Sequence, residues 1–314
     1  LEQGARHSLN GGMFALVGEV LVDLVRERGE GLCLRGVLGG SSLNTAGVLA
    51  QLGAEVVFFG EVGEDWVADW ARKALPPVRA HLQTHPAPMP LALAQLDAEG
   101  NARYTFHRPF REPFHPSLDL LGSPAWFHFG SLYAFDPRTE KGVRALLRAA
   151  HRAGSLVSFD PNLRSTPDEA LWEGLRSYLP FVHLLKLSLE DATLLFPKDP
   201  FEVLALGVPL TVLTLGEEGA LAWFLPYRKE VRVPGQKVAV ADTIGAGDTF
   251  TAALLLLLFQ RGLRGQRDFA LWRGEGLEEA LEGAVELSAL ACTVRGAGLP
   301  AEGVAAWKRR WLRL

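Results

Sequence analysis

The second half of this 314-residue chain alternates between short apolar runs and helical stretches. One such helical stretch, residues 139–153, carries arginines on its polar face. A strand–helix–strand succession predicts a doubly wound, mainly parallel α/β sheet covered by helices. The strands expected in this half are residues 126–129, 155–159, 184–188 and 208–215, then a hairpin of 220–224 and 230–233. Residues 264–276 look like a polar insertion without a regular pattern, and helices follow at 277–294 and after Pro300.

The first half contains similar elements. Residues 14–23 form one apolar run that predicts a buried strand ending at Asp23. Ligands bind beyond the carboxyl ends of such strands, so Asp23 is a candidate ligand for a polar substrate, the alternative being an exposed loop aspartate. Gly39 and Gly40 open a helix that Gly53 closes. They allow a ligand close to the backbone, and Asn44 offers both a donor and an acceptor.

A strand at 55–59 and a helix at 65–75 come next, and the pattern then changes. Residues 91–97 and 102–108 are strand-like runs around a polar turn at 98–101, which predicts a β-hairpin. An isolated hairpin is marginally stable, so this one must pair with other strands or pack on the body of the protein.

A glycine-rich turn, Asp242-Thr-Ile-Gly-Ala-Gly-Asp-Thr-Phe250, leads directly into an apolar helix. The unpaired N–H groups of Gly245, Ala246 and Gly247, with the positive end of the helix dipole, predict an anion site. If the anion is a phosphoryl group in transfer, Asp248 in the first turn is placed to take a proton from a hydroxyl. The alternative is an ordinary strand-to-helix turn in which Asp248 only complements the helix dipole.

Composition narrows the classes of partner and location. A net charge of −4 argues against nucleic acid and anionic membranes as partners. Cys33 and Cys292 form no metal or disulfide pattern, which favours a cytoplasmic protein. The longest apolar run, residues 251–259, is far shorter than the ~20 residues of a membrane span. Residues 1–12 precede Met13 and are expected to be a vector-derived leader, which leaves 13–314 as a single domain.

The glycine-rich turn resembles the C-terminal signature of the PfkB/ribokinase family of carbohydrate kinases. Gly39 and Gly40, with Gly53 and Gly63, resemble its N-terminal signature, although Ser42 stands where Gly, Ala or Pro is usual. Asp160-Pro-Asn-Leu-Arg164 resembles a segment of fructokinases, the members to which the chain is most similar. The resemblance implies a ribokinase-like three-layer α/β/α fold. It also implies a small β lid formed by about 20–38 and 86–112, which sometimes serves as a homodimer clasp.

The resemblance implies transfer of the ATP γ-phosphoryl group to a sugar primary hydroxyl, most plainly that of fructose. The alternatives are a 2-keto-3-deoxygluconate kinase and a non-catalytic sugar-binding regulator. Asp248 is then the base, assisted by Gly245, Ala246, Gly247 and Arg164, the last of which is otherwise a surface partner of Asp160. The remaining implied contacts are Asp23, Gly39, Gly40, Asn44 and Arg108 for the sugar and Lys186, Thr214, Gly216 and Gly219 for the nucleotide.

The cofactors implied are ATP, Mg²⁺ and a monovalent cation such as K⁺. Asp191 would hold Mg²⁺ through water, with Ser188 at the other position of the family's metal motif. Val285 occupies the place of an asparagine that the family usually has near adenine.

Overall fold

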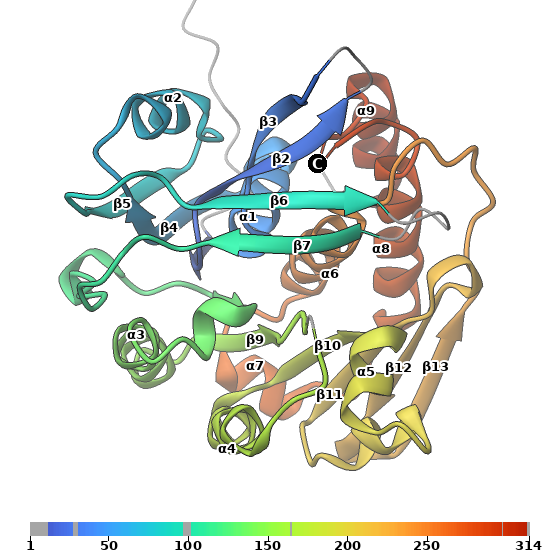
Figure 1. The fold of residues 1–314 in the computed structure, drawn as a ribbon. Coiled ribbons are helices and arrows are strands. Elements are labelled where there is room, and N and C mark those ends of the chain that lie inside the picture. The colour runs from blue at the N-terminus through green and yellow to red at the C-terminus, as the bar shows by residue number, and fades with distance from the viewer. Residues whose placement is uncertain (1–11, 28–30, 97–101, 164, 297, 313–314) are drawn as a thin grey trace, which may run out of the picture.

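The computed structural model describes residues 12–27, 31–96, 102–163, 165–296 and 298–312, and in them two sheets lie one above the other (Figure 1). The main sheet has the order β13-β12-β11-β10-β9-β8-β1-β4-β5, and its pairs are parallel except β11–β12 and β12–β13. Its strands are β1 Met13–Val17, β4 Glu55–Val62, β5 Arg79–Thr84, β8 Trp126–Gly130, β9 Leu156–Asp160, β10 Leu184–Ser188, β11 Leu210–Thr214, β12 Ala220–Phe224 and β13 Lys229–Val233.

Helices cover both faces of the main sheet, because alternate strand residues point in opposite directions. Phe14 and Leu16 belong to one apolar cluster, and Ala15 and Val17 to the other. The first cluster includes α1 Ser41–Leu52, α2 Trp66–Ala74, α6 Ala246–Gln260, α7 Gln266–Leu271, α8 Leu277–Ala291 and α9 Ala301–Trp311. The second includes α3 Glu140–Arg152, α4 Glu169–Tyr178 and α5 Leu189–Leu195. The predicted three-layer fold is confirmed.

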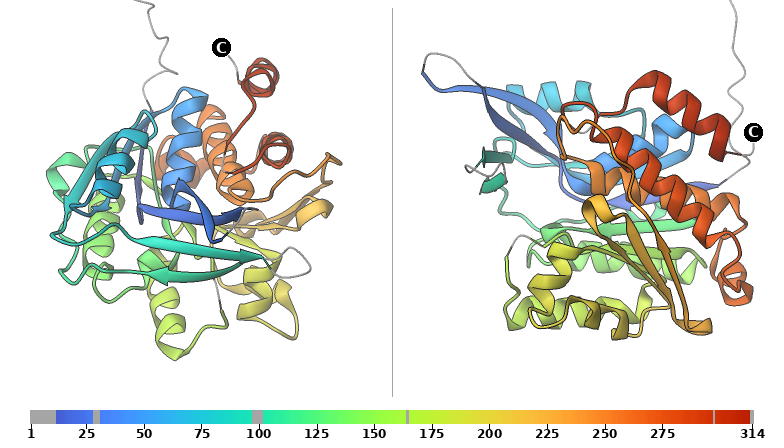
Figure 2. Two further views of the ribbon diagram at one scale, coloured as in Figure 1. Left: turned by 45° about the horizontal axis from the view of Figure 1, so that its top comes forward. Right: turned by 90° about the vertical axis from the view of Figure 1, so that its right-hand side faces the viewer.

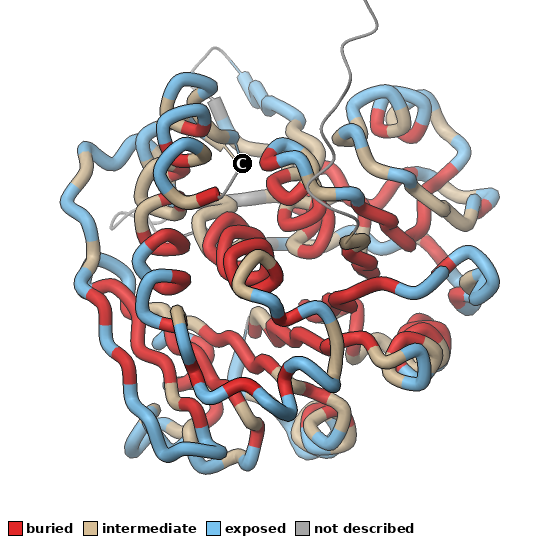
Figure 3. The backbone as a smooth tube through the Cα atoms, turned by 180° about the vertical axis from the view of Figure 1, so that it is seen from behind, coloured by how far each residue is buried: buried red, intermediate tan, exposed pale blue. Residues whose placement is uncertain are grey.

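Helix α6 is the most deeply buried helix of the first layer, and it is almost entirely red in Figure 3. All residues from Thr249 to Phe259 are buried, so the helix is apolar around its whole circumference, as expected for a core helix. With 15 residues it is still too short to cross a bilayer, and no helix in the described part of the chain meets that requirement.

The small sheet has the order β3-β2-β6-β7. Its strands are β2 Leu21–Glu27, β3 Cys33–Gly39, β6 Leu91–Leu96 and β7 Ala102–His107, and the β2–β3 hairpin projects from the body (Figure 2). The predicted hairpin therefore exists and pairs with β2, as its marginal stability required. Its turn lies outside the described residues, as does all of the expected leader except residue 12.

The prediction of one strand over 14–23 was wrong. The chain leaves the main sheet at Gly18, whose N–H donates to Phe59 O, and Val22 N donates to Pro90 O in the small sheet. Asp23 therefore lies within β2 instead of at the end of β1. Apolar residues continue beyond the break because the start of β2, at Leu21 and Val22, is buried as well. Strand β5 was not predicted, and α7 forms within the segment 264–276, for which the sequence showed no regular pattern.

Candidate active site

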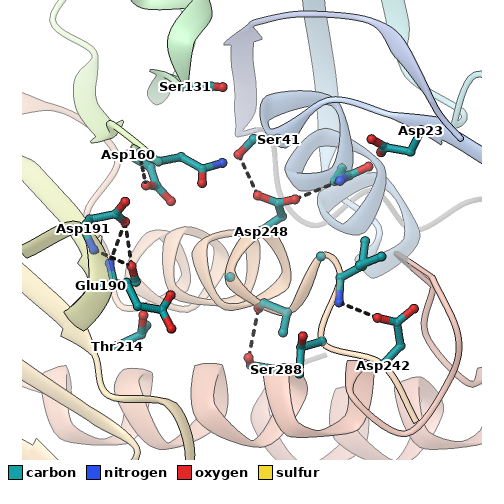
Figure 4. A pocket seen from close by; sticks show the side chains of 18 of the residues that line it. Asp23, Ser41, Ser131, Asp160, Glu190, Asp191, Thr214, Asp242, Asp248 and Ser288 are labelled. Carbon is teal, nitrogen blue, oxygen red and sulfur yellow. Dashed lines mark hydrogen bonds between the residues drawn. The ribbon is translucent and has the colours of Figure 1, made fainter. Parts of the chain in front are cut away.

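A cleft of about 2530 Å³ opens between the carboxyl ends of the parallel strands and the small sheet. In the main sheet, β4 and β5 lie on one side of β1, and the strands from β8 to β11 lie on its other side. The strand order therefore reverses at β1. Ligands bind at such a reversal of strand order. Figure 4 shows acidic and hydroxyl side chains from both sheets and from α6 converging on this cleft.

Asp248 lies at the base of the cleft in the first turn of α6 (Figure 4). Ser41 Oγ donates to its Oδ1 at 2.7 Å, and Asn44 Nδ2 donates to its Oδ2 at 2.8 Å. Both donors come from the start of α1, which packs against α6. Burial raises the pKa of Asp248 to about 6, although the two hydrogen bonds each lower it. A carboxylate with this pKa is ionised at neutral pH and suited to accept a proton.

The glycine-rich turn adopts the geometry of a helix start. Gly245 is the N-cap with φ 76°, a conformation that glycine favours. The expectation of three unpaired N–H groups needs a correction, since Ala246 N donates to Thr243 O at 3.2 Å. This turn bond forms because the chain reverses tightly just before the helix. Ser288 Oγ of α8 donates to Ala246 O at 2.9 Å and fixes the turn from the other side.

Lys186 brings a buried positive charge to the same turn. A Cβ atom added to Gly247 would lie 3.2 Å from its Nζ, so the ammonium faces the start of α6. Nζ also forms a 3.0 Å ion pair with Asp160 Oδ2, and both side chains are buried. Burial lowers the pKa of Lys186, but Asp160 and Asp191 outweigh this and leave it above its ordinary value. The lysine therefore stays charged beside the predicted anion site.

The turn between β11 and β12 forms another wall of the cleft. Thr214, Gly216 and Gly219 line it, together with Val285 from α8. Gly219 has φ 101°, and a Cβ there would meet Val233 O at 2.1 Å. The turn therefore requires glycine at this position and presents mostly backbone to the cleft.

The carboxylate of Asp191 is already engaged within the protein. Oδ1 accepts from Leu163 N at 2.7 Å, and Oδ2 accepts from Ser188 N and Oγ at 3.0 and 2.8 Å in a capping box. Its assignment as a water-mediated metal ligand stays a prediction. The described residues contain no group of three or more His, Cys, Asp or Glu side chains that could by itself hold a metal ion. The oxygen donors on this wall, Asp160 and Glu190, nevertheless suit Mg²⁺, which is usually held by phosphates and one or two carboxylates.

The small sheet supplies the opposite end of the cleft. Asp23 Oδ2 packs on Gly39 so closely that a Cβ there would lie 2.0 Å away, and a Cβ on Gly40 would lie 2.1 Å from Glu19 O. Arg108, at the end of β7, lines the cleft and forms a long 3.9 Å ion pair with Asp136. The structure thus brings the predicted sugar residues together, while Arg164 lies outside the described residues.

Sequence analysis missed several polar side chains at the site. Ser41 adjoins the Gly-Gly pair, and its place in the first turn of α1 was a usable signal. The buried cluster around Glu61 could not be recognised from the sequence, because its members lie far apart along the chain. Glu61 accepts from Tyr133 Oη at 2.9 Å and from two Arg138 nitrogens at 2.6 and 2.9 Å, and His85 Nε2 lies 2.6 Å from it.

Comparison with known proteins identifies the class. Residues 13–303 match the family described as pfkB family carbohydrate kinase. The chain is 30% identical to fructokinase-2 of Zea mays over 90% of this chain and 89% of the relative. It is 32% identical to a fructokinase of Klebsiella pneumoniae, over 81% of this chain and 87% of the relative.

Solved structures share the fold. An ATP-bound fructokinase from Xylella fastidiosa superposes with TM-score 0.80 at 24% identity, over 95% of this chain and 98% of that one. A fructokinase double mutant from Vibrio cholerae O395, with fructose, ADP and potassium ion bound, superposes with TM-score 0.75 at 23% identity. The match covers 96% of this chain and 98% of that one. Fold and site thus define a carbohydrate kinase of the ribokinase type, a phosphotransferase with an alcohol group as acceptor. The chain belongs to the pfkB family.

Proposed function

We propose that this kinase transfers the γ-phosphoryl group of Mg·ATP to the primary hydroxyl of fructose. The observation that carries the proposal is the Asp248 carboxylate, held by Ser41 and Asn44 at the start of α6 inside the cleft. A carboxylate has about four lone-pair sites, so it still has room to accept the hydrogen of a substrate hydroxyl.

In this mechanism Asp248 takes the hydroxyl proton as the sugar oxygen attacks the γ-phosphorus, the bond from that phosphorus to the bridging oxygen breaks, and ADP leaves. The N–H groups of Gly245 and Gly247, the Lys186 ammonium and Arg164 stabilise the negative charge on the transferring group. Ala246 contributes through its place in the turn, since its N–H is bonded to Thr243 O. Asp160, Glu190 and, through water, Asp191 would hold Mg²⁺, which would supply charge neutralisation at the phosphates.

The two ends of the cleft hold the two substrates. Asp23, Gly39, Gly40, Asn44 and Arg108 orient the sugar under the small sheet, which acts as a lid that excludes water. Thr214, Gly216 and Gly219 contact the nucleotide. The turn before α6 is tied to the end of α8, because Asp242 accepts from Gly296 N at 2.9 Å and Ala241 N donates to Cys292 O at 2.8 Å. We place a monovalent cation such as K⁺ at this junction.

The test is a coupled ADP-release assay with Mg·ATP and a panel of fructose, 2-keto-3-deoxygluconate, ribose and adenosine. Turnover selective for fructose is the expected result. A preference for 2-keto-3-deoxygluconate would replace fructose as the proposed substrate, with Arg108 as the contact for its carboxylate. Sugar binding by calorimetry without ADP release would instead favour a sugar-binding regulator.

Our proposal extends to the organisation of the protein. Residues 13–314 form one domain that works in the cytoplasm, and two copies pair through their small sheets. Leu32 and Leu34 support such a pairing, because they are 76% and 37% exposed on the projecting hairpin. Light scattering on Leu32→Glu should then report a lighter particle than the unmodified protein gives.

A further inference from the structure

Glu19 carries a carboxylate oxygen that has no partner. Its Oε2 is buried and makes no hydrogen bond, although the residue lines the cleft. Glu61, which lines the same cleft, is the contrasting case, since Tyr133, Arg138 and His85 satisfy both of its oxygens. A buried carboxylate oxygen without a donor is costly, and in a binding cleft that cost is recovered when a ligand supplies the donor.

The position of Glu19 relates it to the reacting end of the sugar. It lies in the short connection between β1 and β2, where its backbone and Cγ pack on Gly40. Ser41, which follows Gly40 in the chain, donates a hydrogen bond to Asp248. Glu19 also acts on Tyr133, whose pKa is raised mainly by burial and further by Glu61 and Glu19. Glu19, Ser41 and Tyr133 all line the same cleft as the predicted base.

We propose that Glu19 accepts a hydrogen bond from a hydroxyl of the bound sugar and selects neutral sugars over sugar acids. This inference rests on the proposed sugar kinase function. An ionised carboxylate accepts hydrogen bonds but cannot donate, so it pairs with a hydroxyl and repels a second carboxylate. Four arginines line this end of the cleft, namely Arg26, Arg35, Arg108 and Arg138. Arg138 is held by Glu61, and Arg108 forms a long ion pair with Asp136.

The test compares Glu19→Gln with Glu64→Gln, a control on an exposed residue of the loop after β4. Fructose binding is measured by calorimetry without nucleotide, and KM values are measured for fructose and for ATP. Glu19→Gln should raise the Kd and KM for fructose about 10- to 100-fold, the range expected for losing a charged hydrogen bond. The KM for ATP should stay unchanged. The ratio of kcat/KM for 2-keto-3-deoxygluconate to that for fructose should rise.

Folding is monitored by thermal melting of the same variants, with Glu19→Ala as a second substitution. Because the carboxylate is unpaired without substrate, neither variant should lower the Tm of the ligand-free protein, while fructose should raise the Tm less than in the unmodified enzyme. Equal fructose Kd values in all proteins overturn the inference and leave the kinase proposal intact. An unmodified enzyme that prefers the sugar acid also overturns it. Failure of the unmodified enzyme to bind or use any sugar contradicts the proposed function itself.

Discussion

A 2.8 Å hydrogen bond joins Asn44 of α1 to Asp248 of α6, although 204 positions separate them in the sequence. The two helices start side by side, so their first turns define one site. Any change that shifts α1 relative to α6 therefore alters the placement of the predicted base. The close packing of these helices in the core limits such shifts.

Replacing the predicted base, Asp248, should strongly reduce turnover but keep the fold. We expect Asp248→Asn to lower kcat by about 10²- to 10⁴-fold, because an amide cannot take the hydroxyl proton. Asp69→Asn, on an exposed turn of α2, is the control and should behave as the unmodified enzyme. Single-turnover kinetics with circular dichroism provide the measurement. Full activity in Asp248→Asn would mean that another group accepts the proton.

The pH dependence of kcat/KM should show an acidic limb near pH 6, the value to which burial raises the pKa of Asp248. Activity is expected to fall as the pH drops below this value, because the protonated carboxyl cannot act as a base. Stability should change in the opposite direction. The folded protein binds this proton more tightly than the unfolded chain, so the contribution of Asp248 to stability rises as the pH falls from about 6 towards 4. Chemical denaturation at several pH values should show this trend, and Asp248→Asn should reduce it.

Removing a hydrogen-bond donor of Asp248 should shift the acidic limb of the pH dependence of kcat/KM. The hydrogen bonds from Ser41 and Asn44 favour the ionised form and lower the pKa of Asp248. Ser41→Ala is therefore expected to shift the acidic limb of kcat/KM to higher pH. Thr193→Ala, which removes an exposed hydroxyl bonded to its own helix, should leave the limb unchanged. A shift to lower pH would contradict the assigned geometry.

The buried Lys186–Asp160 pair offers a test that separates stability from activity. Lys186→Met leaves Asp160 buried without its counter-ion and should reduce the free energy of unfolding by about 3–5 kcal/mol. Adding Asp160→Asn should restore most of that loss in urea denaturation. The double variant should nevertheless remain inactive, because the Lys186 ammonium that faces Gly247 and the Asp160 carboxylate proposed to hold Mg²⁺ are both lost. Recovery of both properties together would argue against a phosphate role for the lysine.

Gly40 should tolerate no side chain. Its φ of 129° disfavours other residues, and a Cβ would lie 2.1 Å from Glu19 O. Gly40→Ala should therefore destabilise the protein and raise the KM for sugar. Gly207→Ala is a matched control, since Gly207 also has a positive φ of 81° but no atom within 4 Å of the added Cβ. The control should cost only about 1 kcal/mol, the penalty of the left-handed conformation alone.

The sequence was informative wherever local chemistry decides structure. The boundaries of α1 follow from Gly40 and from Gly53, which caps it with φ 102°, and α2 begins after Asp65, whose side chain accepts from Ala68 N. The helix start at Asp248 was evident for the same reason. In contrast, Gly18 and Glu19 are the only local signs that β1 ends at Val17, and apolar residues resume at once in β2, so the break was missed.

Contacts between distant segments could not be predicted. Lys186 is assigned to the nucleotide from the sequence without its partner Asp160, for which the sequence offered a surface pair with Arg164 only as the alternative interpretation. Only the pairing of β9 with β10 places Lys186 and Asp160 together inside the protein. Glu61 and Arg138 meet for the same reason, through tertiary packing that one sequence does not encode in any short pattern.

The small sheet consists of two excursions, one between β1 and α1 and the other between β5 and β8. The glycine-rich turn, Asp248 and Lys186 all belong to other segments of the chain. Under the proposed function, recognition of the acceptor and transfer of the phosphoryl group are therefore assigned to largely separate segments of the chain. Replacing these two contiguous segments with those of a relative should change which alcohol is phosphorylated. The residues assigned to phosphoryl transfer would stay unchanged.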